Sequence, residues 1–239
     1  MAFIQAEGLD HRALNEAIRQ ETKCTVMGCR GQRFIASGMK DRQITLEGIP
    51  GNALGAYLTG AEVTVLGNAQ DAVGDTMNDG RIVIHGSVGD AAGYAMRGGM
   101  ILVKGNAGYR AGIHMKEYKE KKPVIVIGGR TGSFLGEYQA GGVIVVLGLH
   151  TDGKPIVGNF PCTGMHGGKM FLRGDLAGID FPKNVTLHTA TAEDMAELMP
   201  YLAEYSTAFD VSPEELQAEP FTVIVPDSAN PYKQMYVAN

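Results

Sequence analysis

Side chains that commonly carry chemistry are few in this sequence and mostly far apart. The 239 residues include six histidines and three cysteines, which are His11, His85, His114, His150, His166, His188, Cys24, Cys29 and Cys162. Only His150, Cys162 and His166 stand near one another, and zinc is bound by such nitrogen and sulfur ligands. A C-x3-H pair with one distant histidine matches no zinc pattern well, so we interpret these residues as structural or surface positions. Cys24 and Cys29 supply too few thiolates for an iron–sulfur cluster.

Two aspartates have a spacing that could bring their carboxylates together. Asp90 follows Asp71 at the same interval at which Asp71 follows Asn52. Paired carboxylates can bind calcium or act as a general acid and base. Aspartate and asparagine at a turn instead accept hydrogen bonds from backbone N–H groups. Because an asparagine takes the equivalent position, we favour turn capping.

Glycine-rich segments raise the question of a nucleotide site. Residues 105–112 and 128–132 lack the strand–GxGxxG–helix context of a dinucleotide fold, and a Walker-type motif is absent. No spacing suggests a Ser–His–Asp or Cys–His constellation. We therefore expect no catalytic, cofactor-binding or metal-binding residues in this chain.

A repeat of constant length organises the middle of the chain. Glycines open successive units at Gly55, Gly74, Gly93 and Gly112, and others close the apolar runs at Gly48, Gly67, Gly86, Gly105, Gly129, Gly148 and Gly174. Aliphatic columns stand two and four positions before the closing glycines: Leu46, Val65, Ile84, Val103, Ile127, Val146 and Leu172, and Ile44, Val63, Ile82, Ile101, Ile125, Ile144 and Met170. A third column holds Leu58, Met77, Met96 and Met115. The pattern indicates strands with one aliphatic face.

A unit this short cannot bury its apolar face alone and needs identical neighbours above and below. We therefore predict an all-β fold, a single-stranded parallel β-helix of about seven coils with short terminal helices. The glycines would lie at corners, because glycine enters positive φ without steric cost. Antiparallel hairpins or a sandwich are the alternative, but they rarely keep so strict a period. A doubly wound α/β sheet is disfavoured, since no crossover helix fits within one repeat.

One outward-facing column of the predicted strands is unusual. It runs through Thr45, Thr64, Val83, Leu102, Val126, Val145 and Phe171. Its last five members are apolar, and an exposed stripe of that length would favour association. The stripe must be covered by a terminal helix or by another subunit. We favour the C-terminal helix of the same chain, with partner contacts added.

The ends of the chain differ from the repeat. Residues 10–21 have helical spacing with Asp10 as N-cap, and Thr191 to Asp194 resembles a capping box. Ser212 followed by Pro213 marks another helix start, and residues 221–225 form a short strand before a proline-punctuated tail. We divide the chain into an N-terminal capping segment (1–30), a β-helix domain (31–190) and a C-terminal helical cap and tail (191–239). The helices are expected to shield strand edges at the solenoid ends.

Two longer steps between closing glycines mark insertions. Residues 116–123 form a charged excursion, interpreted as a solvated loop, and residues 151–164 are rich in turn formers. Insertions in solenoids become loops, often on a binding face. Either loop is therefore a place where a partner could make contact.

Composition excludes several classes of protein. Net charge is −5, which argues against nucleic acid or an anionic membrane as the main partner. The N-terminal residues do not resemble a signal peptide, and no window approaches the ~20 apolar residues of a membrane span. Three cysteines that cannot all pair suit a reducing compartment, so a cytoplasmic location is expected.

The glycine spacing in residues 86–89 and 105–108 resembles the GXGXG-type domain. That domain closes the large subunit of glutamate synthase, and it is similar to the C-type subunit of formylmethanofuran dehydrogenase. Residues 93–105 and 140–148 look like coils of that family, the likeness extends from about Gly48 to Gly174, and residues 221–226 resemble its terminal segment. The resemblance implies a right-handed β-helix with a mainly structural role.

In glutamate synthase such a domain packs between an amidotransferase domain and an FMN-dependent synthase domain. The resemblance therefore implies a non-catalytic subunit whose partners are a class II glutamine amidotransferase subunit and an FMN-dependent synthase subunit. FMN and an iron–sulfur cluster would reside on those partners and not on this chain. The alternatives are a structural C-type subunit of a formylmethanofuran dehydrogenase-like complex or a free-standing β-helix protein. A homo-oligomer is also compatible with the sequence.

Overall fold

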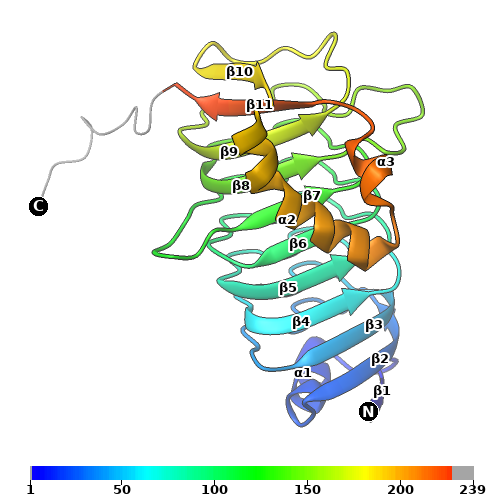
Figure 1. The fold of residues 1–239 in the computed structure, drawn as a ribbon. Coiled ribbons are helices and arrows are strands. Elements are labelled where there is room, and N and C mark those ends of the chain that lie inside the picture. Colours follow the sequence, from blue (N-terminus) through cyan, green and yellow to red (C-terminus); the bar gives the residue numbers. More distant parts are fainter. Residues whose placement is uncertain (1, 228–239) are drawn as a thin grey trace, which may run out of the picture.

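The computed structural model describes residues 2–227, and its single sheet winds into a parallel β-solenoid of about seven turns (Figure 1). The parallel strands β3 to β9 face the viewer and run to the right as the coils climb, which makes the winding right-handed. The predicted β-helix is confirmed. The elements are β1 (Ala2–Gln5), α1 (His11–Arg19), β2 (Lys23–Arg30), β3 (Gln43–Ile49), β4 (Thr59–Val65), β5 (Asp79–Ile84), β6 (Met100–Val103), β7 (Val124–Ile127), β8 (Ala140–Val146), β9 (Gly167–Arg173), β10 (Val185–Thr189), α2 (Ala192–Phe209), α3 (Pro213–Gln217) and β11 (Phe221–Pro226).

The predicted columns are real stacks of side chains. Strands β3 to β9 pair in parallel, so that Val63 lies beside Ile82, Ile82 beside Ile101, and so on to Met170. All members of the two inward columns are buried, as are those of the third column of Leu58, Met77, Met96 and Met115. Burying each Leu, Ile, Val or Met side chain contributes about 1.5–3 kcal/mol, which makes the shared lumen the main source of stability.

Two further strands continue the sheet below the first predicted coil. β2 pairs with β3 in parallel and places Cys24 beside Ile44, at the head of an inward column; β1 pairs with β2 in turn. The pairing of β2 shifts register between Val26 and Cys29, and Cys29 lies opposite Gly48. Gly28 stands two positions after Val26, as closing glycines do in the later strands, but the β-bulge lengthens the step to Gly48 to 20 residues and Cys24 takes the place of an aliphatic column residue, so β2 departs from the strict repeat.

Each corner contains three residues in the left-handed backbone region. In the second coil these are Ala53, Gly55 and Tyr57, with φ of 62°, 66° and 57°. The same positions are left-handed in all seven corners. Neighbouring coils hold the conformation through backbone bonds: the Tyr57 N–H donates to the next coil (2.8 Å) and the Gly55 N–H to the previous one (2.8 Å).

In the five inner corners the middle left-handed residue is glycine for lack of space as well as for its φ, which refines the expectation that positive φ alone explains these residues; in the last corner the middle residue is Cys162, and Gly38 and Gly164 hold outer positions. A Cβ on Gly74 would lie 2.5 Å from Ile101 Cδ1, and one on Gly55 would lie 2.6 Å from Ile82 Cδ1. The middle position therefore faces the lumen, where the isoleucine column leaves no space. In the first corner the middle residue is Ala36, and the equivalent column residue there is Val63, which has no δ carbon.

Helix α1 closes the N-terminal end of the solenoid. Its N-cap is Asp10, as predicted, and Leu14 and Ile18 are buried in the core. The Asn15 side chain accepts the Ala36 N–H (2.9 Å) and donates to the Phe34 carbonyl (3.0 Å). Asn15 thus satisfies backbone groups of the first corner that would otherwise pair with a preceding coil.

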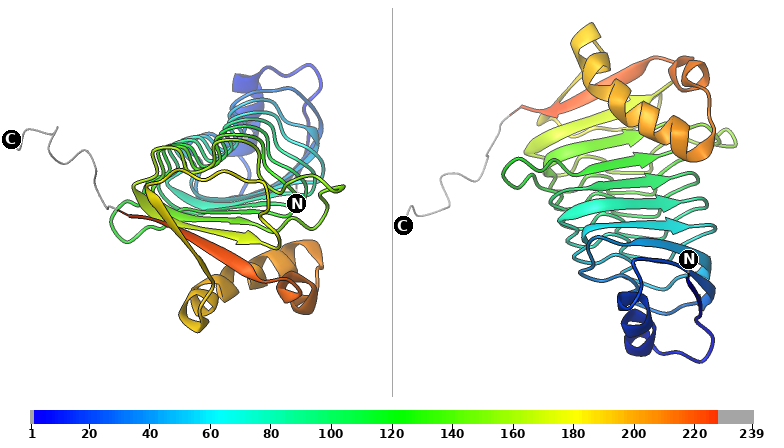
Figure 2. Two further views of the ribbon diagram at one scale, coloured as in Figure 1. Left: turned by 90° about the horizontal axis from the view of Figure 1, so that it is seen from above. Right: turned by 60° about the horizontal axis from the view of Figure 1, so that its bottom comes forward.

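Helix α2 lies across the outer face of the sheet instead of capping an end (Figures 1 and 2). Leu198, Leu202, Tyr205 and Phe209 pack with the outward column from Val83 to Phe171. The prediction that the chain covers its own apolar stripe is confirmed, as are the capping box of α2 and the Ser212 cap of α3.

The expectation that helices protect both strand edges is wrong at the C-terminal end. There β11 pairs antiparallel with β9, and β10 pairs antiparallel with β11. The two antiparallel strands end the parallel stack by pairing with it. They satisfy the backbone N–H and C=O groups at the edge of β9, which a helix packed on that edge would leave unpaired.

The charged insertion forms a small hairpin with a bridge between Tyr118 and Lys121. Among residues 2–227 no helix is long and apolar enough to cross a membrane. The predicted proline-punctuated tail lies outside the described residues, and the three-part division of the chain remains a prediction.

Candidate functional site

The two aspartates singled out by their spacing hold the coils together. Asp71 Oδ1 accepts the backbone N–H of Asp90 (2.9 Å), and Asp90 Oδ1 accepts that of Tyr109 (2.8 Å). The aspartates do cap backbone N–H groups, but each carboxylate caps the next coil and not its own turn as expected. Asn68, Ser87 and Asn106 make a parallel ladder of the same kind. These side chains are used to satisfy backbone donors and do not converge on a reaction centre.

The three thiols lie inside the solenoid. Cys24, Cys29 and Cys162 are buried and free, and burial raises the pKa of Cys162 to about 12. Its Sγ contacts Met170 Sδ at 3.8 Å. A thiol of that pKa stays protonated at neutral pH and is a poor nucleophile and metal ligand.

The histidines are dispersed over the fold. His11 is on α1 near Phe34, His85 packs edge-on against Phe209, and His166 Nδ1 lies 2.9 Å from the Gly164 carbonyl. His150 is exposed at the start of the second insertion. Within residues 2–227 no three His, Cys, Asp or Glu side chains are grouped as metal ligands, so the structure does not assemble His150, Cys162 and His166 into a site.

A surface that the sequence did not reveal follows the left-handed corners. We call it the corner face; it consists of residues 33–38, 52–57, 71–76, 90–95, 109–114, 133–138 and 159–164. The flanking left-handed positions point outward there, because the middle one points into the lumen. In the later coils these outward positions, together with Tyr94 beside one of them, carry rings and one guanidinium. We call this part the aromatic wall: Tyr94, Arg110, His114, Phe134, Tyr138 and Phe160.

The side chains of the aromatic wall contact one another from coil to coil. His114 stacks on Tyr138 with ring centroids 5.2 Å apart and planes at 7°, and Tyr94 meets the same histidine edge-on at 5.9 Å. Arg110 lies 4.9 Å above the Phe134 ring. Phe134 in turn contacts Phe160 at 5.3 Å. Such ring pairs contribute about 0.5–1.5 kcal/mol each, so the wall is ordered before any partner arrives.

A signal for the aromatic wall was present in the sequence. Tyr57, His114 and Tyr138 each stand two positions after a corner glycine. The apolar columns that reveal the repeat point inward and do not include the residues that follow the corner glycines.

The third and fourth corners, residues 71–76 and 90–95, carry three aspartates. Asp71 and Asp90 are exposed and Asp75 is half-buried. The ion pairs found within residues 2–227 do not include any of these three carboxylates. Arg110, the nearest cation along the wall, pairs with Glu137 at 3.2 Å.

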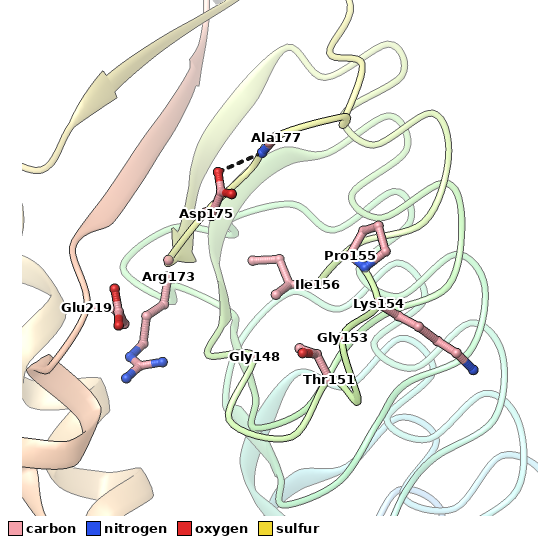
Figure 3. A pocket seen from close by; sticks show the side chains of 11 residues that line it. Gly148, Thr151, Gly153, Lys154, Pro155, Ile156, Arg173, Asp175, Ala177 and Glu219 are labelled. Carbon is pink, nitrogen blue, oxygen red and sulfur yellow. Dashed lines mark hydrogen bonds between the residues drawn. The ribbon is translucent and has the colours of Figure 1, made fainter.

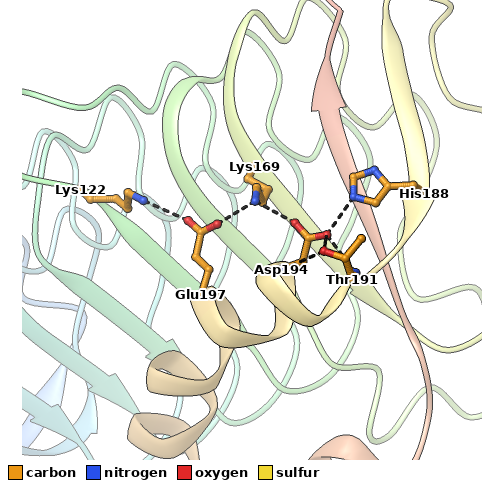
Figure 4. Close-up of polar contacts among 6 residues, drawn as sticks. All are labelled: Lys122, Lys169, His188, Thr191, Asp194 and Glu197. Carbon is orange, nitrogen blue, oxygen red and sulfur yellow. Dashed lines mark hydrogen bonds and ion pairs between the residues drawn. The ribbon is translucent and has the colours of Figure 1, made fainter.

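An ion-pair network on the opposite, sheet side clamps α2 in place (Figure 4). Lys169 Nζ of β9 bridges Asp194 Oδ1 (2.9 Å) and Glu197 Oε2 (2.7 Å) of the helix. Glu197 also accepts from Lys122 of the charged insertion (3.0 Å), and Asp194 Oδ2 lies 3.0 Å from His188 Nε2 of β10. The network thus joins four separate segments of the chain.

Asp194 is the most strongly perturbed group of this network. Burial raises the pKa of its carboxyl, but hydrogen bonds from Thr191, Lys169 and His188 lower it more, and the net pKa lies well below the usual value. Burial opposes the charged forms of Glu197 and Lys169 as well, but their mutual contacts hold the pKa of Glu197 below its ordinary value and that of Lys169 above. Asp194 therefore stays charged and acts as a structural anion.

A cleft of about 530 Å³ lies beside the second insertion, between that loop and the end of β9 (Figure 3). Its principal cation, Arg173, donates to the carbonyls of Leu147 (3.3 Å), Glu215 (3.0 Å) and Leu216 (3.1 Å). Arg173 thus ties the end of α3 to the sheet. Lys154 points away from the cleft in Figure 3, so the cleft has few groups directed at a ligand.

Comparison with known proteins agrees with this architecture. The model of a family described as GXGXG motif matches residues 14–225. Uncharacterized protein MJ1350 of Methanocaldococcus jannaschii is 40% identical over 249 residues, covering 98% of this chain and 95% of its own. A chain of the formyltransferase/hydrolase complex FhcABCD from Methylorubrum extorquens, solved with methylofuran, has a TM-score of 0.64 at 18% identity, covering 91% of this chain and 87% of its own. That identity shows a shared fold only. Because the family model spans nearly the whole solenoid and the strands that close it, the chain belongs to the GXGXG motif family.

Proposed function

We propose that this chain is a non-catalytic structural subunit of a glutamate synthase-like enzyme. It would pack between a class II glutamine amidotransferase subunit and an FMN-dependent synthase subunit in the cytoplasm. FMN and the iron–sulfur cluster would belong to those partners. Membership of the GXGXG family and the resemblance of its coils to the glutamate synthase domain support this assignment.

One observation carries the structural part of the proposal. The carboxylate and thiol side chains that could take part in catalysis either hold elements of the fold together or are buried in the lumen. Asp71 and Asp90 cap backbone donors, Asp194 anchors α2, and Cys162 is buried. A catalytic site needs such groups directed at a shared point, whereas a spacer needs them where they stabilise the fold.

A second candidate is a structural C-type subunit of a formylmethanofuran dehydrogenase-like complex. It is favoured by the likeness in fold to a chain of the formyltransferase/hydrolase complex of Methylorubrum extorquens. The two candidates share the scaffold role and differ in the partner subunits.

Co-purification from the native host tests both. A tagged chain should retain an amidotransferase and an FMN-containing protein, with the flavin visible by absorbance and both subunits identified by mass spectrometry. Retention of formyltransferase or hydrolase subunits instead would establish the second candidate. Glutamine hydrolysis or glutamate formation by the isolated chain would contradict the structural role.

A further inference from the structure

We propose that the corner face is the docking surface for a partner protein subunit, and that the partner presents lysine and arginine side chains to its acidic part and apolar side chains to its aromatic wall. This inference rests on the proposed structural role and adds the face and the chemistry of contact. It does not depend on which enzyme the partner belongs to.

Exposed aromatic rings are concentrated on the corner face. Eleven large apolar side chains are exposed within residues 2–227, and six of them lie on the corner face: Phe34, Tyr57, Tyr94, Tyr109, Tyr138 and Phe160. Phe160 is 61% and Tyr57 56% exposed. Tyrosine, phenylalanine and arginine are the residues enriched at the centres of protein interfaces. Solvent-exposed rings gathered on one side of a solenoid therefore indicate a protein contact.

The aromatic wall is held rigid by contacts within the chain. The rings of the aromatic wall stack on each other, and their backbones are held by hydrogen bonds to the coils on both sides. Ordering flexible side chains is a main cost of association. A surface that is ordered in advance avoids much of that cost, as a docking surface should.

The corner face also carries negative charge. Asp71, Asp75 and Asp90 lie on two successive coils, and none belongs to an ion pair within the described chain. The guanidinium of Arg110 is already neutralised by Glu137. Electrostatic complementarity then requires a basic patch on the partner opposite the three aspartates. The same carboxylates would repel the phosphates of a nucleic acid.

Several other parts of the surface are covered by elements of the chain itself. Helix α2 occupies the apolar part of the outer sheet face, α1 closes the N-terminal end, and β10 and β11 follow the last parallel strand. The corner face extends along the solenoid, and α1 contacts it at the first corner, where His11 lies against Phe34.

Two variants test the surface without disturbing the fold. Tyr138→Asn with Phe160→Asn removes two rings, and asparagine is among the residues most tolerant of the left-handed backbone that both positions adopt. Asp71→Asn with Asp90→Asn removes two charges and keeps an oxygen to accept each capped N–H. Leu187→Ser, at a 39% exposed position on β10, is the matched control. Circular dichroism melting should show all three variants folded.

The measurement is retention of partner subunits by the tagged full-length chain from the native host, in increasing salt. We expect the aromatic double variant to retain at least about tenfold less partner. The charge variant should lose partner about threefold at low salt and show a flatter salt dependence. Leu187→Ser should match the wild type. Zero-length carboxyl–amine coupling of the wild-type complex should join Asp71, Asp75 or Asp90 to partner lysines.

The outcomes separate the two proposals. Wild-type retention of both corner variants, or crosslinks confined to α2 and the sheet face, would overturn the corner face while leaving the structural role intact. Loss of an unexpected partner in the corner variants would support the face and reject the glutamate synthase assignment. A wild-type chain that retains no partner under conditions that preserve complexes would overturn both.

Discussion

The lumen and the corner face of this solenoid use the same backbone conformation under opposite constraints. Gly74 faces the lumen at φ 69°, and Ala72 and Thr76 on either side have φ of 56° and 51°. Conformational strain alone would call for glycine at all three positions. In this corner glycine stands only at the position where a Cβ would meet Ile101 of the neighbouring coil.

The difference shows that steric space, more than φ, dictates the glycine repeat. Backbone hydrogen bonds to two neighbouring coils hold the five inner corners in place, so an outward side chain can bear a cost of about 1–2 kcal/mol for the left-handed region. The outer positions are thereby free to vary, and in this chain they carry the aromatic wall. Each prediction below challenges this contrast, starting with the largest effect.

The strongest test places a methyl group in the lumen. Gly74→Ala should lower the free energy of unfolding by about 3 kcal/mol, since overpacking costs about 1–3 kcal/mol and the left-handed alanine adds about 1. Ile101 is fully buried and has no room to move aside. Urea denaturation followed by circular dichroism measures the loss.

A second substitution distinguishes collision from strain. Ile101→Val removes the δ carbon that the new methyl would meet and should cost about 1 kcal/mol by itself. If space is decisive, the double variant is more stable than Gly74→Ala alone. Simple addition of the two losses would refute the steric explanation. Ala72→Gly is the control and should change stability by less than about 1 kcal/mol.

Substitution of an outward-facing side chain should lower stability strongly only where another element covers that side chain, as at Asp194. Asp194→Asn should cost about 2 kcal/mol at pH 7, because it removes a buried partner of Lys169. The pKa of the Asp194 carboxyl is lower in the folded chain than in the unfolded chain. Its contribution to the free energy of unfolding is therefore full at neutral pH and fades as pH falls below about 5. The deficit of the variant should therefore shrink toward pH 3 in thermal melts.

The exposed pair beside Asp194 provides the comparison. Lys122 contacts Glu197 with a side chain that is 44% exposed, and exposed pairs contribute little. Lys122→Met should stay within about 0.5 kcal/mol of the wild type. An equal loss in both variants would mean that coverage by α2 is not what matters.

On the uncovered corner face, the capping ladder should have a smaller effect. Asp90→Ala leaves the Tyr109 N–H without its acceptor and should cost about 1 kcal/mol. Asp90→Asn keeps an acceptor and should be nearly neutral. Equal melting temperatures for the two variants would show that the cap contributes nothing.

Sequence periodicity was sufficient for the inward half of this molecule. Ile82, Ile101 and Val103 lie at the predicted positions of adjacent strands. Each inward position of a solenoid has the same surroundings in every coil, so the same residue type recurs there in the sequence. Cover by α2 followed from the apolar residues between those columns. The bulge after Val26 sets β2 outside the strict period, since one extra residue lengthens the step from Gly28 to Gly48.

The outward half escaped prediction because its order comes from contacts between different residue types. His114, Tyr138 and Tyr94 share no chemical class that a repeat search would align, and the rings meet only once the coils are stacked. Arg110 over Phe134 is likewise a contact between coils. Periodicity reports what recurs, and a binding surface is defined by what differs from one coil to the next.

The smallest effect is expected where the contrast predicts full tolerance. Tyr57 is left-handed at φ 57°, 56% exposed and outside the ring stacks found within residues 2–227. Tyr57→Asn should leave stability within about 0.5 kcal/mol of the wild type or raise it slightly, because asparagine adopts the left-handed region more readily. Tyr57→Val is the informative partner, since a β-branched residue is poorly tolerated there. If valine were as stable as asparagine in urea titrations, the coil-to-coil hydrogen bonds would suppress even severe strain, and steric space in the lumen would be the only constraint on the repeat.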